Sequence, residues 1–304
     1  MADILVAMRA LAMGAALALP APALLAEVVQ TEATQAEALA PAAPGTALAS
    51  DAALRHLGEV MQIADLIAIM QQEGLEYGRT LQTQMFPDAD PAAWEAEVAR
   101  IYDPARMKAG FDAALAQALA GDGATIAAAE AFFAPARGQK ILGLELEARR
   151  ALLDDAVEAA ARDAARQMQE DGAPRYDLLR RFADTNDLVE LNVMGALNAN
   201  LAFYKGLSRG GAFDQPMSES DMLAEVWGQE ADVRVETEEW LWPYLSLAYG
   251  PLSDEELQAY IGFSGSDAGQ RLNAAIFAAF DALFNDISMQ LGLAAARQLQ
   301  GQDI

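Results

Sequence analysis

The chain of 304 residues contains no cysteine and a single histidine, His56. Without cysteine it can form no disulfide, no thiolate nucleophile, no cysteine-ligated zinc site and no lipid anchor on a cysteine. With one histidine, a Ser–His–Asp triad or a multi-histidine metal site would have to be built around His56 alone. A lone histidine on a mostly apolar helix side is more often a surface or core residue than a ligand. The sequence therefore predicts no catalytic residue, no metal site and no cofactor.

Basic residues are also scarce, because 20 lysines and arginines stand against 45 aspartates and glutamates, a net charge of −25. A charge of this sign and size repels phosphate backbones and anionic membrane surfaces. We therefore expect no nucleic-acid partner. The acidity favours a basic partner or a role in solubility.

Patterns typical of strands and of common ligand-binding loops are missing as well. No run of alternating β-branched residues predicts a strand, and no glycine-rich loop predicts a phosphate site. Apolar residues make up 53% of the chain, but many are alanine, which favours helix and adds little buried area. Helix starts are marked at Asp90-Pro91, at Asp103-Pro104 and by a capping box at 253–256. We therefore predict an all-α fold.

The first 26 residues have the pattern of a secretory signal peptide. Arg9 precedes an uncharged Ala/Leu-rich run that prolines interrupt near its end. A membrane anchor or an ordinary apolar helix is the alternative, but the unbroken part, 10–19, is too short to cross about 30 Å of hydrocarbon. Residues 27–50 are small, polar and proline-containing, and they predict a flexible tether. Because no later stretch is long and apolar enough to span a bilayer, we expect a periplasmic or secreted protein with no membrane span after signal removal.

Two short phrases occur twice in the chain. FFAPARGQKI at 132–141 is matched by FSGSDAGQRL at 263–272, an offset of 131 residues. LRHLGEVMQIADL at 54–66 is matched by LRRFADTNDLVEL at 179–191, an offset of 125 residues. The difference between the offsets requires a net six extra residues in the second copy, which loops accommodate easily. The matches therefore predict a tandem duplication.

The repeated unit is predicted to be a helical bundle, with about 8–10 helices in the whole chain. Unit one covers 51–172 and unit two covers 174–304, with Gly172-Ala173-Pro174 at the boundary, where a helix should stop. In each copy the phrase marks a short helix that ends at phenylalanine. A glycine in the first turn of the next helix then lets another backbone approach closely.

Each unit is predicted to end in a long helix, around 141–160 in the first copy and 272–291 in the second. At about 100° per residue, both segments place their apolar residues in the same arc. In the first copy this arc includes Leu152, Leu153, Ala156, Val157 and Ala160. The two helices are therefore expected to bury the same face.

Glu145 and Arg149 interrupt the apolar arc of the first copy, where the second copy has Ile276 and Phe280. Residues four apart on a helix can form an ion pair with each other. The pair can lie on an exposed part of the helix, form a buried structural pair, or line a ligand site between helices. The sequence favours exposure or partial burial, since buried charges are costly unless satisfied.

Aromatic residues are only 7% of the chain, and several gather at 236–249. Trp240, Trp242 and Tyr244 surround Pro243, which is expected to kink or end its helix, and glutamates precede them. Aromatic rings beside carboxylates can form a sugar-binding cleft, and two carboxylates about 5–9 Å apart could hydrolyse a glycosidic bond. The simpler interpretation is that the rings fill the core and the glutamates face solvent. Glu145, Arg149, Trp240, Trp242 and Tyr244 are therefore the candidate binding residues.

The phrase F-x-x-P-x-x-G-Q-K at 132–140 resembles the signature of an uncharacterised bacterial family, domain of unknown function 2059. The second copy keeps Phe263 and Gly269 but has Ser266 in place of proline and Arg271 in place of lysine. The resemblance implies an exported, all-helical protein. It carries over no catalytic residue.

These observations predict an exported, non-enzymatic protein that acts by binding a partner or in association with the cell envelope. One alternative is a carboxylate-based hydrolase or carbohydrate-binding protein that uses residues 236–249. Another is a carrier that holds a small apolar ligand between the helical units. The partner would accordingly be a protein or a small apolar molecule.

Overall fold

The computed structural model describes residues 44–213 and 217–301, and side chains from residue 51 onward. The predicted signal peptide at 1–26 and most of the predicted tether at 27–50 lie outside this range. Within it every regular element is an α-helix, which confirms the all-α class. In the same part of the chain, no helix has both the length and the apolar character needed to cross a bilayer.

The helices are more numerous than the eight to ten expected, because short capped helices separate the long ones. Those before residue 172 are α2 (Pro44–Val60), α3 (Ile63–Met85), α4 (Pro91–Ile101), α5 (Pro104–Ala118), α6 (Gly123–Phe133), α7 (Ala136–Ala151) and α8 (Asp155–Glu170). Those after it are α9 (Pro174–Thr185), α10 (Leu188–Arg209), α11 (Glu219–Trp227), α12 (Glu230–Tyr249), α13 (Asp254–Ser264) and α14 (Asp267–Leu299).

Side-chain caps start several of these helices, as the sequence predicts. Asp90 accepts a hydrogen bond from the backbone N–H of Ala92, and Asp103 accepts one from Arg106. Ser253 starts α13 with a complete capping box. Each cap satisfies backbone donors that the first helical turn leaves unpaired.

Corresponding positions of the two halves have the same local geometry. Gln62 and Asp187, 125 residues apart, both adopt left-handed backbone angles, with φ of 55° and 48°, where α2 meets α3 and α9 meets α10. The amide of Gln139 donates to the carbonyls of Val60 and Phe133 at 2.8 and 2.9 Å. The amide of Gln270 donates in the same way to Thr185 and Ser264 at 3.3 and 3.1 Å. The repeated glutamine therefore ties each closing helix to the turn between two earlier helices.

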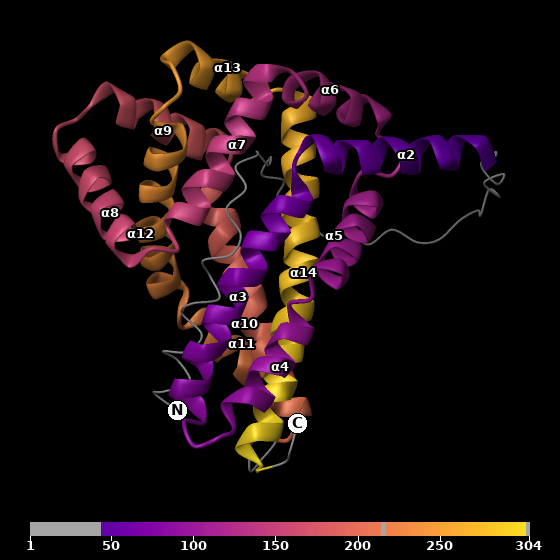
Figure 1. The fold of residues 1–304 in the computed structure, drawn as a ribbon, viewed down its shortest axis with the longest axis vertical. Helices are drawn as coiled ribbons and strands as arrows, with labels where there is room; N and C mark the ends of the chain where they lie inside the picture. The colour runs from indigo at the N-terminus through magenta and orange to yellow at the C-terminus, as the bar shows by residue number, and fades with distance from the viewer. Residues whose placement is uncertain (1–43, 214–216, 302–304) are drawn as a thin grey trace.

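Helices from the part of the chain before residue 172 pack directly against helices from the part after it. Helix α5 of the first half packs against α14, and α12 of the second half packs against α7. Phe132 and Phe263, equivalent residues of the repeated phrase, stack on each other with ring centroids 4.3 Å apart. One continuous hydrophobic core includes buried residues of both halves. Figure 1 shows α14 running along most of the long axis, with α6 and α13 across one end.

The closing helices differ in a way that the shared sequence pattern does not predict. Helix α14 is continuous over 33 residues, but in the first half the helix ends at Ala151 and α8 starts at Asp155. The Asp154 side chain accepts hydrogen bonds from the N–H groups of Ala156 and Val157, so it starts a new helix. Helix α8 then packs against α12 on the outside of the molecule (Figure 1). The expected burial of 152–160 is therefore wrong at Leu153, Ala156, Val157 and Ala160, which are exposed.

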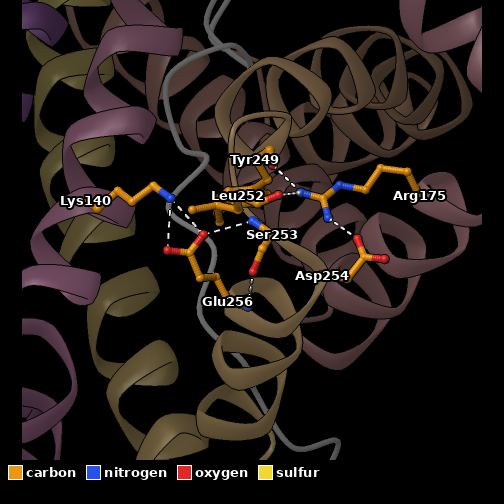
Figure 2. A network of polar contacts seen from close by, with 7 residues as sticks. All are labelled: Lys140, Arg175, Tyr249, Leu252, Ser253, Asp254 and Glu256. Atoms are coloured by element: carbon orange, nitrogen blue, oxygen red, sulfur yellow. Dashed lines mark hydrogen bonds and ion pairs between the residues drawn. The ribbon is translucent and has the colours of Figure 1, made fainter.

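A polar network fixes the turn between α12 and α13 (Figure 2). Arg175 of α9 donates to the carbonyls of Tyr249 and Leu252 and pairs with Asp254 at 2.6 Å. Lys140 of α7 pairs with Glu256, the second member of the α13 capping box, at 2.7 Å. The network joins α7, α9 and α13, and it thereby positions the residues on either side of the turn.

Candidate functional site: a buried charge cluster and its cavity

Helix α7 places Glu145 and Arg149 one turn apart in the interior, where they are 4% and 3% exposed. The expectation of an exposed or half-exposed pair is therefore wrong. The cause is that α12 of the second half packs against α7 and that Tyr260 of α13 bonds to Glu145.

Glu145 is bonded to two tyrosines of the second half. Its Oε1 accepts hydrogen bonds from the hydroxyls of Tyr249 and Tyr260 at 2.8 and 3.2 Å. Burial raises the pKa of Glu145 to about 7, although the two tyrosine hydrogen bonds act in the opposite direction. The carboxyl group therefore changes charge near neutral pH.

Arg149 forms a bidentate ion pair with Glu73 of α3. Arg149 Nε lies 2.7 Å from Glu73 Oε1, and Nη2 lies 2.7 Å from Oε2. Burial opposes the charged form of Arg149, but the Glu73 carboxylate outweighs it and holds the pKa above the ordinary value of arginine. The Glu73 side chain is 25% exposed, so the pair joins the interior to the surface.

Tyrosines surround both charged groups. Burial raises the pKa of Tyr102, and the negative charge of Glu73 adds to this effect. Burial also raises the pKa of Tyr244, with Glu145 raising it further and Arg149 lowering it. These neighbours keep their protons and remain hydrogen-bond donors at neutral pH.

The second half fills the corresponding place with apolar side chains. Ile276 and Phe280, which correspond to Glu145 and Arg149, are 0% and 3% exposed, and Phe280 packs against Phe111 with centroids 4.6 Å apart. The same helical arrangement therefore accepts a fully apolar core at these positions. A buried ion pair is often less stabilising than apolar residues of similar volume. Helical packing alone thus gives no reason for the charges on α7.

A cavity of about 230 Å³ adjoins the Arg149–Glu73 pair. It lies between α3, the break from α7 to α8, α12 and α14, so both halves contribute to its walls. Its lining residues are mostly apolar or aromatic: Met70, Glu73, Gly74, Glu76, Tyr77, Thr80, Tyr102, Arg149, Leu152, Leu153, Asp155, Trp240 and Phe284. An apolar cavity of about 150 Å³ is enough to bind benzene. This one can therefore hold a small organic molecule.

The break between α7 and α8 forms one side of the cavity. Leu152, Leu153 and Asp155 lie at the break and line the space, whereas Trp240 and Phe284 close it from the second half. A shallower depression shares Glu76, Leu153 and Asp155 with the cavity and extends over the surface beside α3. The cavity therefore has a path to solvent between α3 and the start of α8.

Two of the five candidate residues from the sequence, Arg149 and Trp240, line the cavity, and Glu145 and Tyr244 belong to the buried cluster beside it. Trp240 lines the cavity and stacks on Tyr244 with centroids 4.9 Å apart, and Tyr244 is close enough to feel the charges of Glu145 and Arg149. Trp242 instead packs against Tyr176 of α9, with ring centroids 5.4 Å apart. The two tryptophans therefore face different neighbours instead of forming the walls of one sugar-binding cleft.

Of the two outcomes expected at Pro243, a kink or the end of its helix, the structure contradicts the second. The proline lies inside α12, which continues to Tyr249. The residue whose carbonyl loses its helical partner is Glu239, which is exposed, and water can satisfy a carbonyl at the surface. Glu238 is exposed as well, as the simpler interpretation of this region predicts.

Glu73 is the main residue that the sequence analysis missed. It occupies a position in an otherwise apolar stripe of α3 that includes Leu66, Met70, Tyr77 and Leu81, all buried. An acid at helical spacing within such a stripe is the same signal that identified Glu145. Tyr102 carried no comparable signal, because its place at the cavity depends on the turn between α4 and α5.

His56 is exposed on α2, with its Nδ1 3.7 Å from a carboxylate oxygen of Glu59. It is thus a surface residue, one of the two ordinary places for a lone histidine.

Comparison with known proteins finds no matching family model, no similar curated protein and no similar solved structure. A functional proposal therefore rests on the geometry of the site and not on a relative.

Proposed function

We propose that this protein is a non-enzymatic binding protein that holds a small, largely apolar molecule in the cavity between its two halves. The observation that carries the proposal is the apolar cavity of about 230 Å³ beside the Arg149–Glu73 pair. Two of the sequence-based hypotheses, a binding protein and a carrier of a small apolar ligand, meet in this proposal.

Two features of the site lower the stability of the fold: the cavity and the buried ion pair. Side chains around an empty cavity lose the dispersion contacts that a filled core provides. A buried ion pair carries a desolvation penalty, and α14 shows that apolar residues fit the corresponding positions. A bound apolar molecule would supply the missing dispersion contacts, so its binding would stabilise the fold.

The hydrolase alternative has less support from the same geometry. Glu145, whose pKa lies near neutral pH, is 4% exposed and covered by Tyr249 and Tyr260. Glu73, one of three carboxylates that line the cavity, has both oxygens bonded to Arg149. A general acid needs to reach the substrate, and a carboxylate held in a bidentate pair with arginine is a poor nucleophile. The binding function therefore fits the arrangement better.

The proposal is tested by measuring the binding of 2-phenylethanol to the purified chain by isothermal titration calorimetry, with Trp fluorescence recorded in parallel. We expect saturable binding that changes the fluorescence, because Trp240 lines the cavity. Leu153→Trp should abolish binding by filling the rim of the cavity, since Leu153 is 44% exposed and tolerates a larger residue.

Leu223→Trp is the matched control, because Leu223 is 38% exposed on α11 and lies outside the cavity lining. Binding that survives Leu153→Trp unchanged would show that the molecule binds elsewhere. The cavity would then have no role in binding.

We also propose that the chain is exported and consists of two tandem copies of one helical unit related to the domain of unknown function 2059 family. The signal-peptide pattern at 1–26 and the repeated phrases support this. Cell fractionation with N-terminal sequencing of the mature protein tests the export. Retention of the full N-terminus in the cytoplasmic fraction would contradict it.

A further inference from the structure

We infer that the molecule held in the cavity is a cation: an apolar or aromatic amine or ammonium compound. This inference rests on the proposed binding function and specifies the chemical class of the ligand. Three features of the site point to it: the charge at the mouth, the accepting capacity of Glu73, and the aromatic walls.

The mouth of the cavity is acidic. Glu76 and Asp155 line both the cavity and the adjoining surface depression, and the depression also includes Asp154. Arg79 also lines the depression, but it pairs with both Glu76 and Glu95, so it offsets one of these two charges. The local charge at the entrance therefore stays negative, in line with the net charge of −25. Such a field attracts cations and slows the entry of anions.

Inside the cavity, Arg149 is already neutralised by Glu73. Each Glu73 oxygen accepts one hydrogen bond from Arg149, and a carboxylate oxygen can accept two. A ligand N–H group can therefore bind Glu73 without breaking the ion pair. An anionic ligand would have to displace Glu73 from Arg149, which would leave a partly buried carboxylate unpaired.

The remaining walls suit an organic cation. Tyr77, Tyr102 and Trp240 line the cavity together with aliphatic side chains. Aromatic faces attract ammonium groups, and the attraction is strongest where water is excluded. Aromatic residues beside carboxylates therefore favour a ligand that combines an apolar body with a positive charge.

The experiment compares three probes that share one apolar body: 2-phenylethylamine, 2-phenylethanol and 3-phenylpropionate. Binding to the full chain is measured by isothermal titration calorimetry at pH 7, at low salt and at 0.5 M NaCl. We expect the amine to bind at least about fivefold more tightly than the alcohol, the carboxylate to bind most weakly, and salt to reduce the difference. Equal affinities would overturn the charge inference and leave the binding function standing. No binding of any probe would overturn both.

Charge-neutral variants locate the effect. Glu76→Gln and Asp155→Asn should each weaken the amine about two- to fivefold and leave the affinity for the alcohol unchanged. Glu95→Gln, which removes a charge that also pairs with Arg79 but lies outside the cavity lining, should leave both affinities unchanged. An equal loss for the amine and the alcohol would show that the carboxylates act through structure, which would overturn the inference.

Discussion

Glu145 and Arg149 lie one turn apart on α7, and each is satisfied by residues of other helices. Tyrosines of α12 and α13 donate to Glu145, and Glu73 of α3 pairs with Arg149. Each charge depends on a residue from a distant part of the chain. Substitution of Glu145 or Arg149 should therefore change the stability of the fold more than substitution of an exposed charged residue on the same helix.

The contribution of Glu145 to the stability of the protein should fall as pH rises from about 4.5 to above 7. Its pKa is about 7 in the folded state against an ordinary 4.5, so the folded state prefers the protonated form. The stabilisation is fully present below pH 4.5 and is lost as pH rises through 7, a change of up to about 3 kcal/mol. Urea unfolding at pH 5 and pH 8 measures it.

Glu145→Gln should remove this part of the pH dependence, because the amide cannot ionise. Glu147→Gln, an exposed position on the same helix, should leave the pH dependence as in the wild type. The difference between the two variants isolates Glu145 from other titrating groups such as Asp187, whose pKa burial also raises. Identical pH profiles for the wild type and Glu145→Gln would contradict the assignment.

Arg149→Leu should lower the free energy of unfolding by about 2–4 kcal/mol, because it leaves Glu73 partly buried and unpaired by its main partner. Arg150→Leu, at the exposed neighbouring position, should change it by less than about 0.5 kcal/mol. The double change Glu73→Leu with Arg149→Leu should recover part of the loss, since no charge is stranded. A double-mutant cycle with no coupling between the two positions would refute the ion pair.

Helices α10 and α14 pack almost backbone to backbone where two glycines meet. A Cβ atom on Gly206 would lie 2.9 Å from the Cα of Gly292, and one on Gly292 would lie 3.0 Å from the Cα of Gly206. Helical packing at this distance leaves no room for a side chain. Helix α14 also carries Phe284, which lines the cavity.

Gly206→Ala should therefore destabilise the protein by about 1–3 kcal/mol, because the added methyl group meets backbone that cannot move aside. Gly195→Ala, on the same helix with open space at its Cβ position, should instead stabilise it by about 0.5–1 kcal/mol. Thermal unfolding followed by circular dichroism distinguishes the two outcomes. Equal effects at both glycines would rule out the close crossing.

Helices of each half pack against helices of the other around one core. Each half alone would therefore expose part of this core to solvent. Helix α5 depends on α14 for its packing, and α7 depends on α12. The cavity likewise needs Tyr77 and Leu152 from the first half and Trp240 and Phe284 from the second. The predicted units at 51–172 and 174–304 therefore need not fold as independent domains.

Chemical unfolding should accordingly proceed in one cooperative transition. Trp94 is buried in the first half and Trp240 in the second, so variants that retain one of these tryptophans report on each half. We expect the two midpoints to coincide, and the separately expressed halves to lack a cooperative transition. Two separated midpoints would instead establish two independent domains.

The sequence by itself determined the helical class, the caps that start the helices and the close backbone approach at Gly138 and Gly269. These features depend on residues within a few positions of one another, and local hydrogen bonding and backbone freedom decide them. The apolar residues of α14 recur at helical spacing, and this pattern within one helix predicted its buried face.

Only the tertiary structure decided that Glu145 and Arg149 are buried and that Glu73 joins the site. The sequence pattern allowed a straight helix through 160 and an exposed ion pair. Tyrosines of α12 and α13, which follow about a hundred residues later, satisfy Glu145, and Glu73 of α3 pairs with Arg149. Burial and pairing over such separations depend on how the halves interlock, and periodicity within one helix carries no information about that.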